Sequence, residues 1–161
     1  MKFHLLDRVH ELAGDRIVAS KNVTLAEEYL GDHFPTFPVL PGVLMLEAAT
    51  QAAAWLAFHE SGLLDDPYDG PTIAVLKSAR NVRYGHFVAP GRTLFVTATA
   101  GGDLKYNVEG KVDDKIAFTG KLALAALRVP SHDAANAKLV AAHRARWAAL
   151  TAAGSPALAL A

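Results

Sequence analysis

Cysteine is absent from this chain of 161 residues, and its sixteen basic and sixteen acidic side chains cancel. The lack of cysteine excludes thiol catalysis and cysteine-ligated metal sites. Because no net charge remains, the chain has no overall field of the kind that attracts nucleic acid or an anionic membrane surface. Any charged partner must therefore bind a local patch, and no nucleic-acid partner is predicted.

Long apolar runs are also missing, although 52% of the residues are hydrophobic. Polar residues interrupt each stretch before it reaches the ~20 residues that a membrane-spanning helix needs. The N-terminus carries Lys2, Asp7, Arg8 and Glu11, so it lacks the apolar core of a signal peptide. We expect one core domain, without a membrane segment, in the cytoplasm.

The N-terminal part predicts a hairpin followed by a stiff loop. Residues 8–12 and 16–23 show apolar residues near alternation, and Ala13-Gly14-Asp15 between them supplies turn residues. A short helical turn is expected over 25–30. The stretch from Gly31 to Pro41 holds three prolines, which exclude regular structure there.

A helix is predicted from Val43 to about His59, because alanine and leucine dominate this stretch and proline and glycine are absent. Pro41 stands at its start, where the missing N–H costs nothing. Few side chains between Val43 and Phe58 are polar, so no face is suited to solvent. We expect this helix to be buried nearly all round.

Beyond a loop over 62–71, four runs rich in β-branched and aromatic residues predict strands. They are residues 72–84, 93–100, 105–112 and 115–127. Short turn segments separate them, which indicates an antiparallel meander. The fold class is therefore α+β, with an antiparallel sheet wrapped round one buried helix.

The last part of the chain differs in composition. Ser131 can cap a helix over 133–153 that ends at Gly154-Ser155-Pro156. Its stripe of larger side chains is Leu139, His143, Trp147 and Leu150. We interpret residues 1–128 as the domain, and 129–161 as an appended helix and loose tail whose stripe packs on the domain or on a neighbouring subunit.

Two residues do not fit a plain core. Glu47 places a carboxylate in a helix that is otherwise apolar, where an unpaired charge is costly. His33 lies on the proline-rich loop that leads into the same helix, and histidine titrates nearest neutral pH. Either residue alone is more often structural than catalytic, but together they supply one base and one acid.

The surroundings of this pair favour catalysis. Gln51 follows Glu47 by one turn, so its amide can orient the carboxyl group. The N–H groups at the helix start, around Gly42 and Val43, form a partial positive charge. Such a charge suits a carbonyl oxygen that becomes negative when a neighbouring proton is removed.

The segment from His33 to Gln51 resembles the signature of the bacterial 3-hydroxyacyl-acyl-carrier-protein dehydratases of fatty acid synthesis. The segment reads His33-Phe34-Pro35-Thr36-Phe37-Pro38-Val39-Leu40-Pro41-Gly42-Val43-Leu44-Met45-Leu46-Glu47-Ala48-Ala49-Thr50-Gln51. The histidine-to-glutamate spacing, the Pro-Gly before the helix and the glutamine one turn later all agree with that signature. A looser similarity extends over most of residues 5–127.

The resemblance implies a hot-dog fold, in which a curved antiparallel sheet wraps a long central helix, and homodimers in which two sheets join. The resemblance also allows three such dimers to assemble into a trimer of dimers. It implies that His33 removes the proton α to the thioester, that Glu47 protonates the departing hydroxyl group and that Gly42 holds the thioester oxygen. No metal or redox cofactor is implied, because the substrate arrives on the phosphopantetheine arm of acyl carrier protein.

Three features depart from the family pattern. The family usually has glycine in place of Thr36 and often a polar residue in place of Phe37; with Phe34, these residues are expected to form the substrate pocket. The tail after Pro130 is additional. A specialised dehydratase, a hot-dog thioesterase and a non-catalytic acyl-carrier-binding module all remain open readings.

The expected docking surface for the acidic carrier protein is a group of cations around the 72–84 strand and its exit turn. The candidates are Lys77, Arg80, Arg83 and Arg92. Solvated strand faces carry such residues routinely, so a plain solvent-exposed surface is an equally good reading.

Overall fold

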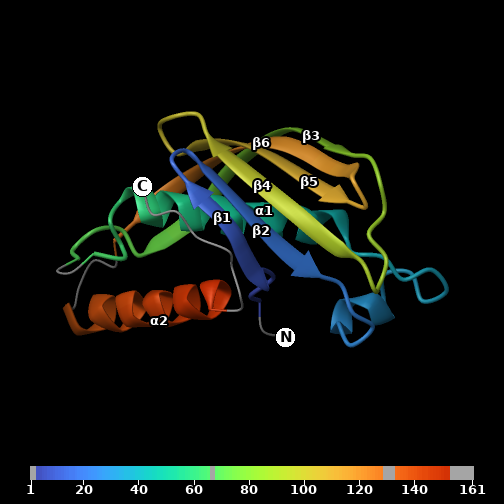
Figure 1. Cartoon of the computed structure of the whole chain (residues 1–161), viewed down its shortest axis with the longest axis horizontal. Helices are drawn as coiled ribbons and strands as arrows, with labels where there is room; N and C mark the ends of the chain where they lie inside the picture. The colour runs from blue at the N-terminus through green and yellow to red at the C-terminus, as the bar shows by residue number, and fades with distance from the viewer. Residues whose placement is uncertain (1–2, 66–67, 129–132, 153–161) are drawn as a thin grey trace.

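The computed structural model describes residues 3–65, 68–128 and 133–152. A curved antiparallel sheet wraps round one long helix (Figure 1). The strands are β1 (Arg8–Ala13), β2 (Arg16–Asn22), β3 (Ile73–Tyr84), β4 (Thr93–Ala100), β5 (Lys105–Val112) and β6 (Lys115–Leu127). The helices are η1 (Glu28–Gly31), α1 (Gly42–Glu60) and α2 (Asp133–Thr151). The predicted strands and central helix are confirmed, whereas Ser131 and the residues predicted to end the last helix lie outside the described residues.

The strand order is β1-β2-β4-β5-β6-β3, which corrects part of the predicted meander. Strands β4, β5 and β6 do follow one another, but β3 pairs with β6 and β2 pairs with β4. The segment 85–92 between β3 and β4 is no tight hairpin turn, so it does not force these two strands to be neighbours. It carries the chain from the edge of the sheet to its middle.

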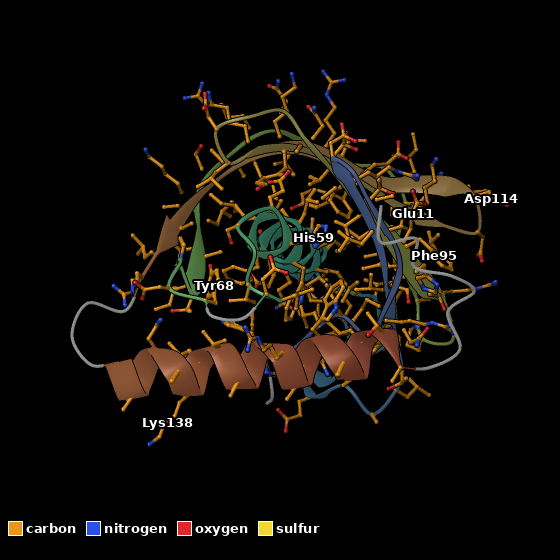
Figure 2. The ribbon with its side chains drawn as sticks, turned by 60° about the vertical axis from the view of Figure 1, so that its left-hand side comes forward. Glu11, His59, Tyr68, Phe95, Asp114 and Lys138 are labelled. Carbon is orange, nitrogen blue, oxygen red and sulfur yellow. The ribbon has the colours of Figure 1, made fainter. Side chains whose placement is uncertain are left out.

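Helix α1 lies against the concave face of the sheet. Figure 2 shows the sheet arching over α1, with His59 near one end of the helix. Ala48, Ala49, Ala52 and Ala53 are fully buried, and these small side chains let the helix approach the strands closely. This packing explains why the central helix is rich in alanine.

The first turns of α1 are more exposed than the sequence predicted. Val43 is 70% exposed and Glu47 is half-buried. The expectation of a helix buried nearly all round holds from Ala48 onward and is wrong for its start. The physical reason is that the strands and α2 cover the later turns, whereas the start of the helix lies beside the proline loop.

Helix α2 covers the side of α1 that the sheet leaves open (Figures 1 and 2). The rings of Trp147 and Trp55 lie 5.3 Å apart, and those of His143 and Phe58 lie 4.9 Å apart. The Thr72 hydroxyl donates a buried hydrogen bond of 2.8 Å to Asn136. The stripe predicted for this helix therefore faces the domain.

Among the described residues, no helix combines the length and the apolar character needed to cross a bilayer.

Candidate active site

The proline loop fixes both the backbone and the ring of His33. Its N–H donates to the carbonyl oxygen of Tyr29 at 3.1 Å, and its carbonyl accepts from the Val39 N–H at 3.3 Å. Ring atom Nδ1 lies 2.9 Å from the Val39 carbonyl oxygen. Because a carbonyl can only accept, Nδ1 carries the proton, and in the neutral ring Nε2 is left as a proton acceptor.

A buried ion pair holds the segment that leads to this loop. The Lys21 side chain is only 6% exposed, and its Nζ pairs with the carboxylate of Glu27. The same Nζ donates to the Asn22 carbonyl oxygen at 2.9 Å. Glu27 directly precedes η1, so the pair attaches the His33 segment to strand β2. This pair could not be predicted from the sequence, because it forms only where β2 and the loop lie side by side.

The start of α1 presents unused backbone donors. The Leu44 and Met45 N–H groups both donate to the Pro41 carbonyl, at 2.9 and 3.1 Å. Among the described residues, the N–H groups of Gly42 and Val43 have no acceptor. They lie at the positive end of the helix dipole and are available to a ligand oxygen.

Tyr84, at the end of β3, packs directly on this helix start. A Cβ atom added to Gly42 would lie 2.9 Å from Cε1 and 3.0 Å from Cζ of Tyr84. Carbon atoms that are not bonded do not approach this closely. Glycine is therefore required at position 42 while the Tyr84 ring occupies this place.

These groups surround one open cleft of about 570 Å³. It is lined by His33, Phe34, Leu40, Pro41, Gly42, Val43, Met45, Tyr84, Gly85, His86 and Phe87. Tyr84, His86 and Phe87 were not among the predicted site residues. The sequence feature that could have indicated them is the run of aromatic and histidine residues at the end of the predicted 72–84 strand.

Thr36 and Phe37, the two loop residues that depart from the family pattern, differ in position. The Phe37 ring makes an edge-to-face contact with Phe87, with centroids 5.6 Å apart, and so adjoins the cleft. Thr36 is exposed and does not line it. The interpretation of Thr36 as a pocket residue receives no support within one chain.

Glu47 belongs to a separate network and does not line the His33 cleft. Gln51 Nε2 donates to Glu47 Oε1 at 2.9 Å and to the Phe3 carbonyl at 2.9 Å. The Leu5 N–H donates to Gln51 Oε1 at 3.0 Å, which fixes the orientation of the amide. The N-terminal segment thus holds the glutamine that orients the glutamate, by the i,i+4 contact that the spacing predicts.

The four candidate docking cations do not all line the same hollow. Lys77 and Arg80 share one hollow with Lys105 and Lys121. Arg83 lines the neighbouring hollow, again with Lys121. Arg92 instead pairs with Asp113 at 3.1 Å. In the described parts of the chain, no three histidine, aspartate or glutamate side chains come together as metal ligands.

The curved sheet, the central helix and the histidine beside the helix start define a hot-dog-fold protein. A family model described as a FabA-like domain matches residues 1–121. Two solved structures share the fold. The dehydratase heterocomplex ApeI:P from Xenorhabdus doucetiae has a TM-score of 0.53 at 20% identity, covering 74% of this chain and 96% of that one. A sigma28-regulated virulence protein from Campylobacter jejuni has a TM-score of 0.56 at 15% identity, covering 82% of each chain.

Two sequence relatives carry the same name, 3-hydroxyacyl-acyl-carrier-protein dehydratase FabZ. The protein from Lactococcus lactis subsp. cremoris is 39% identical over 127 residues, covering 76% of this chain and 84% of its own. That from Aromatoleum aromaticum is 38% identical over 128 residues, covering 76% of this chain and 86% of its own. The chain therefore belongs to the FabA-like family of 3-hydroxyacyl-acyl-carrier-protein dehydratases.

Proposed function

We propose that the chain removes water from a 3-hydroxyacyl thioester on acyl carrier protein and gives the trans-2-enoyl thioester. The observation that carries this proposal is the ring of His33, whose Nδ1–H is held by the Val39 carbonyl. This contact leaves Nε2 as a base in a cleft that also contains the free N–H groups of the helix start. A hydroxyacyl thioester needs both groups, one for the α-proton and one for the thioester oxygen.

The proposed reaction moves two protons and breaks one carbon–oxygen bond. His33 Nε2 takes the α-proton, and the electrons of that C–H bond form the C2–C3 double bond. The C3–O bond breaks as protonated Glu47 gives its proton to the leaving hydroxyl, which departs as water. The helix-start N–H of Gly42 stabilises the negative charge that develops on the thioester oxygen. Proton transfer through water returns both side chains to their starting states, so the reaction requires no metal or redox cofactor.

We further propose that the site is shared between two chains. Glu47 is absent from the lining of the cleft that contains His33, so a second copy is needed to supply the acid. Self-association is supported by the edge strand β3, where Ile73, Val75 and Leu76 are 38–43% exposed. An edge strand with apolar side chains is suited to pairing with another chain. A dimer is the proposed unit, and a trimer of dimers is its proposed higher assembly.

The proposed partner in solution is acyl carrier protein, in the cytoplasm. Arg80 and Lys121 lie directly opposite each other on β3 and β6. Like charges at such positions destabilise a sheet, and no carboxylate of a described residue pairs with either one. An acidic protein surface would neutralise them. Arg83 extends this docking surface, whereas Arg92 is already paired.

Incubation with a 3-hydroxyacyl thioester on acyl carrier protein tests the proposal. We expect an enoyl product, detected by its conjugated absorbance and by mass spectrometry as the loss of water. The His33→Ala variant should be slower by about 10²–10⁴-fold, the usual contribution of a positioned base. Release of the free carrier thiol would instead identify a thioesterase, and binding without reaction would identify an acyl-carrier-binding module.

A further inference from the structure

The side chain of Tyr84 points toward the start of α1. Tyr84 lies opposite Phe118 of β6, and directly opposed residues present their side chains on the same face of a sheet. Phe118 is fully buried in the core, so this face is the concave one. A bulge between Arg80 and Arg83, with Asn81 at φ 54°, sets this register at the end of β3.

The ring of Tyr84 brings its hydroxyl close to the free donors of the helix start. Ring atom Cζ, which carries the hydroxyl, would lie 3.0 Å from a Cβ on Gly42. Side chains of a helix lean toward its N-terminus, the direction in which the first N–H groups also point. A single ligand oxygen at ~2.9 Å from the Gly42 N–H can therefore also lie within hydrogen-bonding reach of the Tyr84 hydroxyl.

The Tyr84 hydroxyl has no hydrogen-bond partner among the residues that the structure describes. The residue is 52% exposed, and no described residue forms a hydrogen bond with its hydroxyl. Burial of part of the ring raises the pKa of Tyr84 above its ordinary value, so the phenol stays protonated at neutral pH. It is thus a neutral donor facing the cleft that contains His33.

We propose that the Tyr84 hydroxyl donates a hydrogen bond to the thioester carbonyl oxygen of the substrate, which the Gly42 N–H also binds. This inference rests on the proposed dehydratase function and adds a second donor to it. As His33 removes the α-proton, negative charge moves onto the carbonyl oxygen and both hydrogen bonds become stronger. Tyr84 is thereby a catalytic residue that contacts the reacting group.

The Tyr84→Phe variant separates this role from simple packing. It keeps the ring that packs on Gly42 and removes only the hydroxyl, so a packing role predicts no loss. We expect kcat to fall by about 10²-fold, as for loss of one oxyanion donor, with little change in KM. Tyr106→Phe is the matched control, because the buried Tyr106 hydroxyl has no hydrogen-bond partner among the described residues and Tyr106 does not line the cleft.

A spectroscopic measurement tests the contact directly. In the His33→Ala background, which cannot turn over substrate, an enoyl thioester labelled with ¹³C at its carbonyl would be bound and examined by infrared spectroscopy. Hydrogen bonding weakens the carbonyl bond, so the stretch should move to higher frequency when Tyr84→Phe is added. Tyr106→Phe should leave it unchanged.

The outcomes of the two proposals are distinguishable. If the wild-type chain forms no enoyl product, the dehydratase proposal itself fails. If the wild type is active, but Tyr84→Phe retains its kcat and the carbonyl frequency does not change, only the role of Tyr84 is overturned. A lower kcat together with the frequency shift supports the assignment.

Discussion

At the scale of single residues, backbone groups fix His33 directly and Glu47 through Gln51. The Val39 carbonyl selects the His33 tautomer, and the Leu5 N–H orients Gln51 beside Glu47. Side chains held in this way lose little further freedom when substrate binds. The chemistry proposed for the cleft therefore depends on residues that never touch the substrate.

Gly42→Ala should show how tightly Tyr84 packs on the helix start. The new methyl group would overlap the tyrosine ring, so we expect a loss of about 1–3 kcal/mol in the free energy of unfolding. Tyr84→Ala should remove much of this penalty, and a double-mutant cycle by chemical denaturation measures the coupling. Gly31→Ala is the control, since nothing lies within 4 Å of a Cβ there. Strictly additive effects would show that the two residues do not contact each other.

At the scale of elements, the loop that carries His33 depends on strand β2. The Lys21–Glu27 ion pair connects β2 to the residue before η1, and it is far less exposed than the surface pair of Arg16 and Glu11. A buried pair contributes little net stability compared with apolar residues, but loss of one partner leaves an uncompensated charge. This asymmetry makes the ion pair sensitive to single substitutions.

Glu27→Gln should therefore destabilise the fold by about 3 kcal/mol, because Lys21 stays buried without its counterion. The turnover rate should fall as well, since His33 follows the same segment. In the exposed pair, Glu11→Gln should cost at most about 1 kcal/mol. Thermal unfolding and steady-state rates measure both effects. If adding Lys21→Met to Glu27→Gln gives no recovery of stability, the buried charge is not the cause.

At the scale of the whole molecule, the shared site predicts recovery of activity in hybrids. A dimer of one His33→Ala chain and one Glu47→Ala chain contains one intact site and one site that lacks both residues. Co-refolding of equal amounts should give roughly a quarter of the wild-type activity, because about half of the dimers are hybrids with one working site. Native mass spectrometry provides the control for subunit exchange. A mixture that exchanges and stays inactive would mean that both residues act within one chain.

Much of this molecule could be predicted because its local signals agree with its global fold. The strand limits follow from β-branched runs between turn residues, and the His33-to-Gln51 segment contains most of the candidate site. The position of β3 could not be predicted, since strand order depends on pairing between distant segments. Tyr84 was missed for the same reason, because its contact with Gly42 exists only when β3 lies beside α1.

The division of the chain into a domain over 1–128 and an appended part over 129–161 remains a prediction. Helix α2 nevertheless joins several separate segments. The His143 ring donates to the Thr72 carbonyl at 2.8 Å, Arg144 donates to the Leu63 carbonyl at 3.2 Å, and Arg146 donates to the Leu6 carbonyl. These three carbonyls belong to parts of the chain that no strand pairing connects.

Helix α2 also sets an order of events during synthesis. Trp55 and Phe58, which it covers, are translated well before residues 133–151 leave the ribosome. At about 5–20 residues per second, the nascent chain spends several seconds with this aromatic surface open to solvent. Apolar surface exposed at that stage is where chaperones bind and where aggregation begins. We therefore expect newly made chains to remain open to chaperone binding at this aromatic surface until α2 docks.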